Sequence, residues 1–141
     1  VADILEEAGV ARSTFYEHFD GRDMVLLDAL EGPLGVLADA AAGTPDHFAL
    51  LALIEHFREQ KRQALELLSG PDGVRVVRRF ASLIRTRLKD GGDDLAIELA
   101  NQQLGQLRLW LAGETRYSPE RLATLLTASA SAMREALAGE P

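Results

Sequence analysis

Residues 9–19, GVARSTFYEHF, decide how the N-terminal part of this chain folds. In the stretch before them, residues 1–8, apolar side chains recur at helical spacing and the acidic residues fall on the opposite side, which predicts a short amphipathic helix. Gly9 supplies the positive φ of a tight turn, and Phe15 and Phe19, four positions apart, can then face the first helix together. Two short helices joined across a glycine turn are typical of a helix-turn-helix DNA reader.

The longer stretch ILEEAGVARSTFYEHFDGRDMVLLDAL, residues 4–30, resembles the DNA-binding signature of the TetR family of bacterial transcriptional repressors. The resemblance implies an all-α protein with a helix-turn-helix DNA-binding domain in residues 1–30 and a helical ligand-binding and dimerisation domain in residues 31–141. It also implies a homodimer that represses transcription from a palindromic operator and is released by a small-molecule inducer. The features that carry it are Ala8-Gly9-Val10, Thr14, Tyr16 with Phe19, and a cation at Arg22.

The outward-facing residues of the second helix are expected to contact DNA. Arg12 lies in its first turn, where a guanidinium can donate two hydrogen bonds to a guanine edge in the major groove. Ser13 can bond to a base or a phosphate, and Tyr16 matches the family tyrosine whose hydroxyl meets a phosphate. The alternatives are a solvated arginine and a half-buried ring that stabilises the small domain. Further phosphate contacts are expected from Thr14, His18 and Arg22.

The net charge of −7 excludes a protein that binds nucleic acid over its whole surface, because Lys and Arg supply most of the nonspecific affinity for phosphate. A small local reader is still compatible with this charge. The chain begins with Val1, inside an expected helix, so we expect a further N-terminal segment before it. In the family that segment holds the first helix and often a basic arm, which would add positive charge.

The composition limits the class of protein. The chain has 141 residues, enough for one good core, and no cysteine, which excludes disulfides and thiolate metal sites. No run approaches the roughly 18 apolar residues of a membrane span, and no signal peptide is recognisable, so a soluble, cytoplasmic protein without membrane contact is expected.

Enzyme activity is not expected from this sequence. No nucleophile elbow, phosphate loop or pair of catalytic acids stands out. His47 and His56 are nine positions apart and out of phase on one helix, so they form no metal-binding pair, and neither a metal nor a cofactor is expected. The alternative to a DNA-binding regulator is a helical protein-interaction domain without sequence-specific DNA binding, which would suit the acidic charge.

Glycine, proline and capping residues divide residues 31–141 into helices, and no segment alternates as a strand would. The helix that opens at Arg22 is expected to be disturbed at Gly32-Pro33 and to resume afterwards. Thr44 is the expected N-cap of one long helix that Gly70-Pro71 closes. The expected helices cover residues 22–30, 37–41, 45–69, 74–88, 93–112 and 119–139.

The last two expected helices carry the predicted dimer interface. Residues 127–132 have small side chains, which let helix axes approach closely, and the preceding helix is apolar over more than one stripe. The resemblance implies that both helices pair with their copies in a four-helix bundle. The alternative is packing within one monomer. The expected contacts are Leu107, Trp110, Leu126, Ala130, Met133 and Leu137.

The resemblance also implies an inducer pocket in the C-terminal domain. Phe48, Phe57 and Phe80 are the candidate apolar walls, and His56 and Gln103 are the candidate polar contacts. Core packing is the alternative for each phenylalanine. The arginines of residues 75–87 largely share one helix face, which would either attract an anionic ligand or lie in solvent.

Overall fold

The computed structural model describes residues 21–138, which form six α-helices and no strand. The all-α class expected from the sequence is therefore confirmed for this part of the chain. None of these helices combines the length and the apolar character of a membrane span. In chain order they are α3 (Gly21–Ala42), α4 (His47–Glu59), α5 (Lys61–Ser69), α6 (Gly73–Arg87), α7 (Asp93–Leu111) and α8 (Pro119–Ala138).

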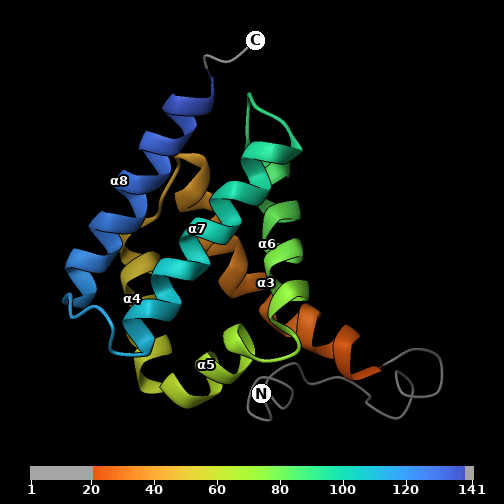
Figure 1. The fold of residues 1–141 in the computed structure, drawn as a ribbon, viewed down its shortest axis with the longest axis vertical. Coiled ribbons are helices and arrows are strands. Elements are labelled where there is room, and N and C mark those ends of the chain that lie inside the picture. Colours follow the sequence, from red (N-terminus) through yellow and green to blue (C-terminus); the bar gives the residue numbers. More distant parts are fainter. Residues whose placement is uncertain (1–20, 139–141) are drawn as a thin grey trace.

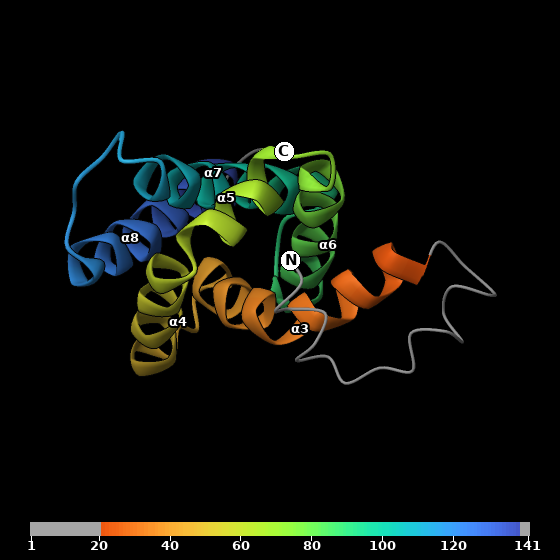
Figure 2. The ribbon, with the colours of Figure 1, turned by 90° about the horizontal axis from the view of Figure 1, so that it is seen from below.

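The helices are arranged around one apolar core, with α7 and α8 on one face of the bundle and α3 and α4 behind them (Figures 1 and 2). Helix α5 crosses one end of the bundle, and the first turns of α3 project beyond the other helices in both views. On α8 the buried positions repeat every four residues, at Leu122, Leu126 and Ala130, which is the spacing of one helix face. That face packs against α3, α4 and α7.

Helix α3 continues through Pro33, although the sequence predicts a disturbance there. A proline inside a helix removes one backbone hydrogen bond and crowds the preceding turn. Here Leu30, Leu34 and Leu37, on both sides of the proline, are all buried against the core. Burial of three leucines outweighs the local cost of the proline, since each contributes roughly 1.5–3 kcal/mol. Tertiary packing therefore keeps α3 in one piece.

Two ion pairs fix α3 beside α6. The Nε and Nη2 of Arg79 donate to the two carboxylate oxygens of Glu31, and the Nε of Arg87 donates to the Oδ1 of Asp39 at 2.6 Å. The partners are 48 positions apart in each case. An equal offset at both pairs means that the two helices run in the same direction, with the pairs about two turns apart.

The long helix expected over residues 45–69 breaks at Gln60, where φ is −104° and ψ is 35°. Neither glycine nor proline causes this break. The buried residues of α4 include Ile54, and those of α5 are Ala64 and Leu67. If α4 and α5 were one straight helix, the buried residues of α5 would lie about a quarter turn around the helix axis from the buried stripe of α4. The bend at Gln60 lets both stripes face the core.

Asp46, and not Thr44 as the sequence predicts, is the N-cap of α4. Its Oδ1 accepts a hydrogen bond of 3.1 Å from the backbone N–H of Ala49, the third residue of the helix. That is the usual N-cap bond to one of the free N–H groups at a helix start. Thr44 instead donates from its hydroxyl to the carbonyl of Asp39, at the end of α3.

Candidate ligand-binding site

A cavity of about 380 Å³ lies among α3, α4, α5, α6 and α7. Small-molecule sites in proteins typically enclose about 300–1,000 Å³, so the cavity is of the size that a compact ligand needs. Its wall is mostly hydrocarbon, because ten of the thirteen lining residues are apolar. These ten are Leu30, Leu34, Leu37, Phe57, Ala64, Leu67, Leu68, Val76, Leu104 and Leu107.

The other three lining residues are polar and come from one short segment at the junction of α4 and α5. His56 lies in the last turn of α4, Gln60 lies between the two helices, and Gln63 lies in the first turn of α5. His56 is exposed, whereas Gln60 and Gln63 are half-buried. An exposed residue that also lines a cavity marks its mouth, so the polar groups gather where the cavity meets solvent.

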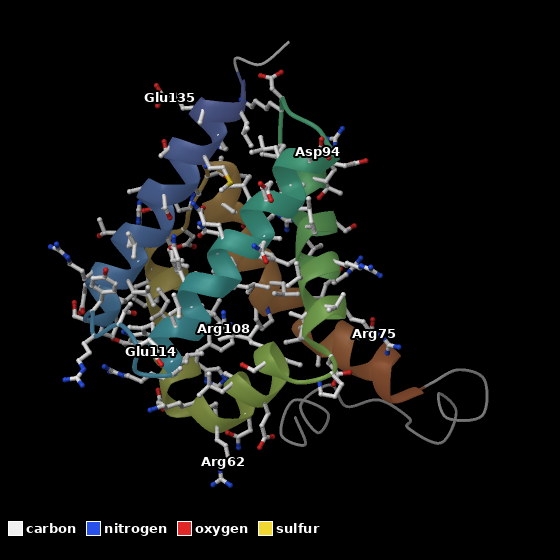
Figure 3. The ribbon with its side chains drawn as sticks, in the orientation of Figure 1. Arg62, Arg75, Asp94, Arg108, Glu114 and Glu135 are labelled. Atoms are coloured by element: carbon white, nitrogen blue, oxygen red, sulfur yellow. The ribbon has the colours of Figure 1, made fainter. Side chains whose placement is uncertain are left out.

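The bend at Gln60 accounts for the position of this cavity. It turns α5 across the end of the bundle, where α5 packs against α6 and α7 (Figure 2). Ala64 and Leu67 of α5 thereby close the cavity, with Ala64 contributing the smallest side chain of the wall. The charged residues of α5 face away from it: Lys61, Arg62 and Glu66 are exposed, and Figure 3 shows Arg62 pointing into solvent.

Of the five residues expected to form the pocket, His56 and Phe57 line the cavity. Phe80 is fully buried among the core side chains instead. Gln103 is also buried, and its amide nitrogen donates to the Oε1 of its α7 neighbour Gln102 at 3.1 Å and to the Oγ of Ser129 on α8 at 3.5 Å. Phe48 lies outside the cavity and is 86% exposed.

Helical phase explains the exposure of Phe48. The buried positions of α4 are Leu50 and Ile54, and Phe48 lies two positions before Leu50, on the opposite side of the helix. Phe57, three positions after Ile54, is close to the buried side and half-buried. Sequence reasoning missed Gln60, Gln63 and most of the cavity leucines. Periodicity does not separate the wall of a cavity from a packed core, and only the bend at Gln60 distinguishes the two here.

A second hollow of about 440 Å³ lies between the start of α6 and the outer side of α7. Val74 and Ile97 line it and are exposed, together with the cations Arg78 and Arg108. Its floor includes Gly105, beside which a side chain would meet nothing within 4 Å. It is a surface groove, in contrast to the hollow inside the bundle.

Several arginines of α6 are engaged in contacts within the chain. Arg79 and Arg87 pair with acids of α3, and Arg85 lies 3.3 Å from the carboxylate of Asp93, at the start of α7. None of the α6 arginines lines the cavity inside the described part of the chain. The arginine face of α6 is therefore outside the cavity and brings no positive charge to it.

Four of the six residues expected at a dimer interface lie inside the monomer. Leu107, Trp110, Leu126 and Ala130 are buried within the bundle, where α7 and α8 pack against the other helices. The indole Nε1 of Trp110 donates to the carbonyl of Tyr117 at 2.7 Å and so fixes the loop between α7 and α8. Of the remaining two, Met133 is half-buried and Leu137 is exposed.

Five of the six residues expected to contact DNA precede the described part of the chain, and the sixth lies at its start. Arg12, Ser13, Thr14, Tyr16 and His18 lie outside the described residues, and Arg22 falls in the first turn of α3. No protein-family model, curated protein or solved structure matches this chain. The motif in the sequence and the cavity in the helical bundle are therefore the two features of this chain that bear on its function.

Proposed function

We propose that this chain is a TetR-like transcriptional regulator, a homodimer that binds a palindromic operator and is released by a small molecule held in the helical bundle. The observation that carries the proposal is the role of α3. This helix begins directly after the helix-turn-helix motif of the sequence, and it supplies Leu30, Leu34 and Leu37 to the cavity wall. One helix thus belongs to both the expected DNA reader and the candidate effector site.

The packing of α3 supports a coupling between these two sites. Arg79 and Arg87 of α6 hold α3 at its middle and in its last turn, and the Nη1 of Arg134, on α8, donates to the carbonyl of Ala41 at 2.6 Å. Its first turns project beyond the other helices of the bundle. A ligand that contacts the cavity side of α3 shifts the reader only if it prefers one position of this helix, because coupling is a difference in affinity between two states.

In the DNA complex, Arg12 would donate hydrogen bonds to a guanine edge, and Tyr16 and Arg22 would contact phosphates. The two subunits would place their recognition helices in successive major grooves, so the half-sites would lie about one helical turn apart or a multiple of it. An effector that changes the position of α3 would change the distance between the two recognition helices. They would then no longer fit successive major grooves, and the operator would be released.

The experiment that tests the proposal measures binding of the intact protein to fragments of its own upstream DNA over a series of salt concentrations. We expect saturable binding to a palindromic fragment that weakens with salt. Arg12→Ala is expected to lose about 1–3 kcal/mol of discrimination at one base pair. Arg62→Ala is the matched control, because Arg62 is an exposed arginine on α5.

Two results would contradict the proposal. Equal affinity for all fragments would favour the protein-interaction domain, for which the exposed Val74 and Ile97 of the α6–α7 groove offer an apolar contact surface. An unchanged sequence preference in Arg12→Ala would show that the recognition helix is not the reader.

A further inference from the structure

The chemistry of the cavity wall defines the kind of molecule that it can hold. Within the described chain, none of its lining residues is Asp, Glu, Lys or Arg. An ion moved from water into an apolar wall without a partner of opposite charge loses hydration that nothing replaces. Among the described residues that line the cavity, only His56 is titratable, and it is exposed at the mouth, where solvent screens its interaction with an anion. The cavity therefore disfavours both anions and cations.

The polar groups of the wall lie at one end. His56, Gln60 and Gln63 follow one another within eight positions of the α4–α5 junction, whereas the leucines of α3, α5 and α7 form the rest of the wall. A glutamine amide offers both a donor and an acceptor, and an imidazole also provides a nitrogen for a hydrogen bond. This end of the cavity matches a single neutral group such as a hydroxyl.

We propose that the cavity binds a neutral, mostly hydrocarbon molecule with one hydroxyl group, as in a medium-chain alcohol, and that the hydroxyl meets His56 and Gln60 at the mouth. The proposal rests on the function proposed above and deepens it by naming the chemical class of the effector. The hydrocarbon part contacts Leu34 and Leu37 of α3, so it touches the helix through which the effector is expected to act.

A displacement assay on the intact protein tests the ligand class. The neutral fluorescent probe phenylnaphthylamine is bound first, and hexanol, octanol, decanol, decanoate and decylammonium then compete for it near neutral pH. Decanol is expected to bind at least about tenfold more tightly than either ion of equal length, because the ions lose part of their hydration beside the half-buried Gln60 and Gln63, where no charged side chain replaces it. Affinity is expected to rise about fourfold for each methylene from hexanol to decanol, as burial of a methylene requires. Failure of the probe to bind, or equal binding of either ion, overturns the proposal.

A pair of alanine variants tests the location. Ala64 lines the cavity and Ala52 is exposed on the outside of α4, so Ala64→Leu fills the cavity while Ala52→Leu makes the same change elsewhere. We expect decanol binding to weaken about tenfold in Ala64→Leu and to stay unchanged in Ala52→Leu. Equal affinities in the two variants would exclude this cavity as the site.

Substitutions at the mouth test the polar end without filling the cavity. Gln60→Glu places a carboxylate where the hydroxyl is expected, and we expect it to reverse the order of affinities, so that decylammonium binds better than decanol. Glu59→Gln changes the charge by one at the neighbouring exposed residue, which does not line the cavity, and should leave the order unchanged. An unchanged order in Gln60→Glu would contradict the assignment of Gln60.

Operator binding is measured separately with and without decanol. If decanol binds in the cavity but leaves operator affinity unchanged, the ligand class is supported and the regulatory function is contradicted. If decanoate or decylammonium binds better than decanol and releases the operator, the regulatory function is supported and the ligand class is overturned.

Discussion

Single polar contacts fix the ends of several helices in this bundle. Asp46 caps the start of α4, Arg134 reaches the last turn of α3, and Trp110 holds the loop that follows α7. Each bond satisfies a backbone group that the helix or turn itself leaves without a partner, and such groups are costly when they stay unpaired away from water. These contacts are also the ones for which single substitutions give the clearest expectations.

Asp46→Ala is expected to lower the free energy of unfolding by about 1 kcal/mol, because the free N–H of Ala49 loses its acceptor. Thr44→Ala is the matched control and should change it by less than about 0.5 kcal/mol, since Thr44 is exposed and its bond to Asp39 is long, at 3.4 Å. Urea unfolding followed by circular dichroism measures both. If Thr44→Ala lowered the free energy of unfolding more than Asp46→Ala did, Thr44 and not Asp46 would be the N-cap of α4.

Alanine substitutions at two glycines are expected to change the free energy of unfolding in opposite directions. Gly32 lies inside α3 with nothing within 4 Å of an added Cβ, so Gly32→Ala should stabilise the fold by about 0.5–1 kcal/mol. Gly43 has a φ of +103°, and a Cβ there would lie 2.9 Å from the guanidinium of Arg134. Gly43→Ala should destabilise the fold by about 1–3 kcal/mol. Thermal unfolding of both variants decides, and a stabilised Gly43→Ala would be incompatible with the left-handed turn.

At the scale of the helices, contacts with α6 restrain α3. The Nε of Arg87 donates to Asp39 at 2.6 Å and its Nη1 to the carbonyl of Leu83 at 3.0 Å, all in a half-buried setting. Arg85 instead pairs with Asp93, which is 96% exposed. Partly buried charge-assisted bonds contribute more than exposed ion pairs, because solvent screens them less.

Arg87→Met is therefore expected to cost about 1–2 kcal/mol of stability, since Asp39 and a backbone carbonyl both lose a donor. Arg85→Met should cost less than about 0.5 kcal/mol. Chemical unfolding of the two variants under identical conditions measures the difference. If the two variants lost the same free energy of unfolding, the contacts of Arg87 with α3 would contribute no more to stability than an exposed ion pair does.

Local sequence signals were sufficient for most helix ends but not for the bend that forms the cavity. Gly70-Pro71 closes α5, Asp93 opens α7 and Pro119 opens α8, as turn and capping chemistry predict. The break at Gln60 has no such signal, because it arises from two buried stripes that must face the same core. A cavity among helices depends on how they pack in space, so its polar mouth was not predictable from periodicity.

At the scale of the whole molecule, the face formed by α7 and α8 is the most suitable for a second copy of the chain. No other described helix lies in front of it in Figure 1, and Figure 2 shows both helices at one edge of the bundle. Ile97, Leu109 and Leu137 on these helices are exposed apolar residues. Since Leu107 and Leu126 are core, a dimer of the kind proposed above would use the outward residues of the same two helices.

The outward side of α8 offers a specific test of such a dimer. Ala128, Ala132 and Ala136 are exposed and four positions apart, so they form a row of small side chains that allows a second helix to approach closely. In a two-fold dimer Ala132→Arg would bring an unpaired cation to the contact from each subunit.

We therefore expect Ala132→Arg to weaken dimerisation by more than about 100-fold, because a two-fold contact repeats the cost in both copies. Ala52→Arg, at the exposed side of α4, makes the same change away from this face and should leave the association constant unchanged. Sedimentation equilibrium of the intact protein and both variants measures the constants. Pairing through this face would be excluded if the parent protein were monomeric at all concentrations, or if Ala132→Arg left the dimer intact. If Ala132→Arg is a monomer that retains its helicity, we also expect it to lose operator binding.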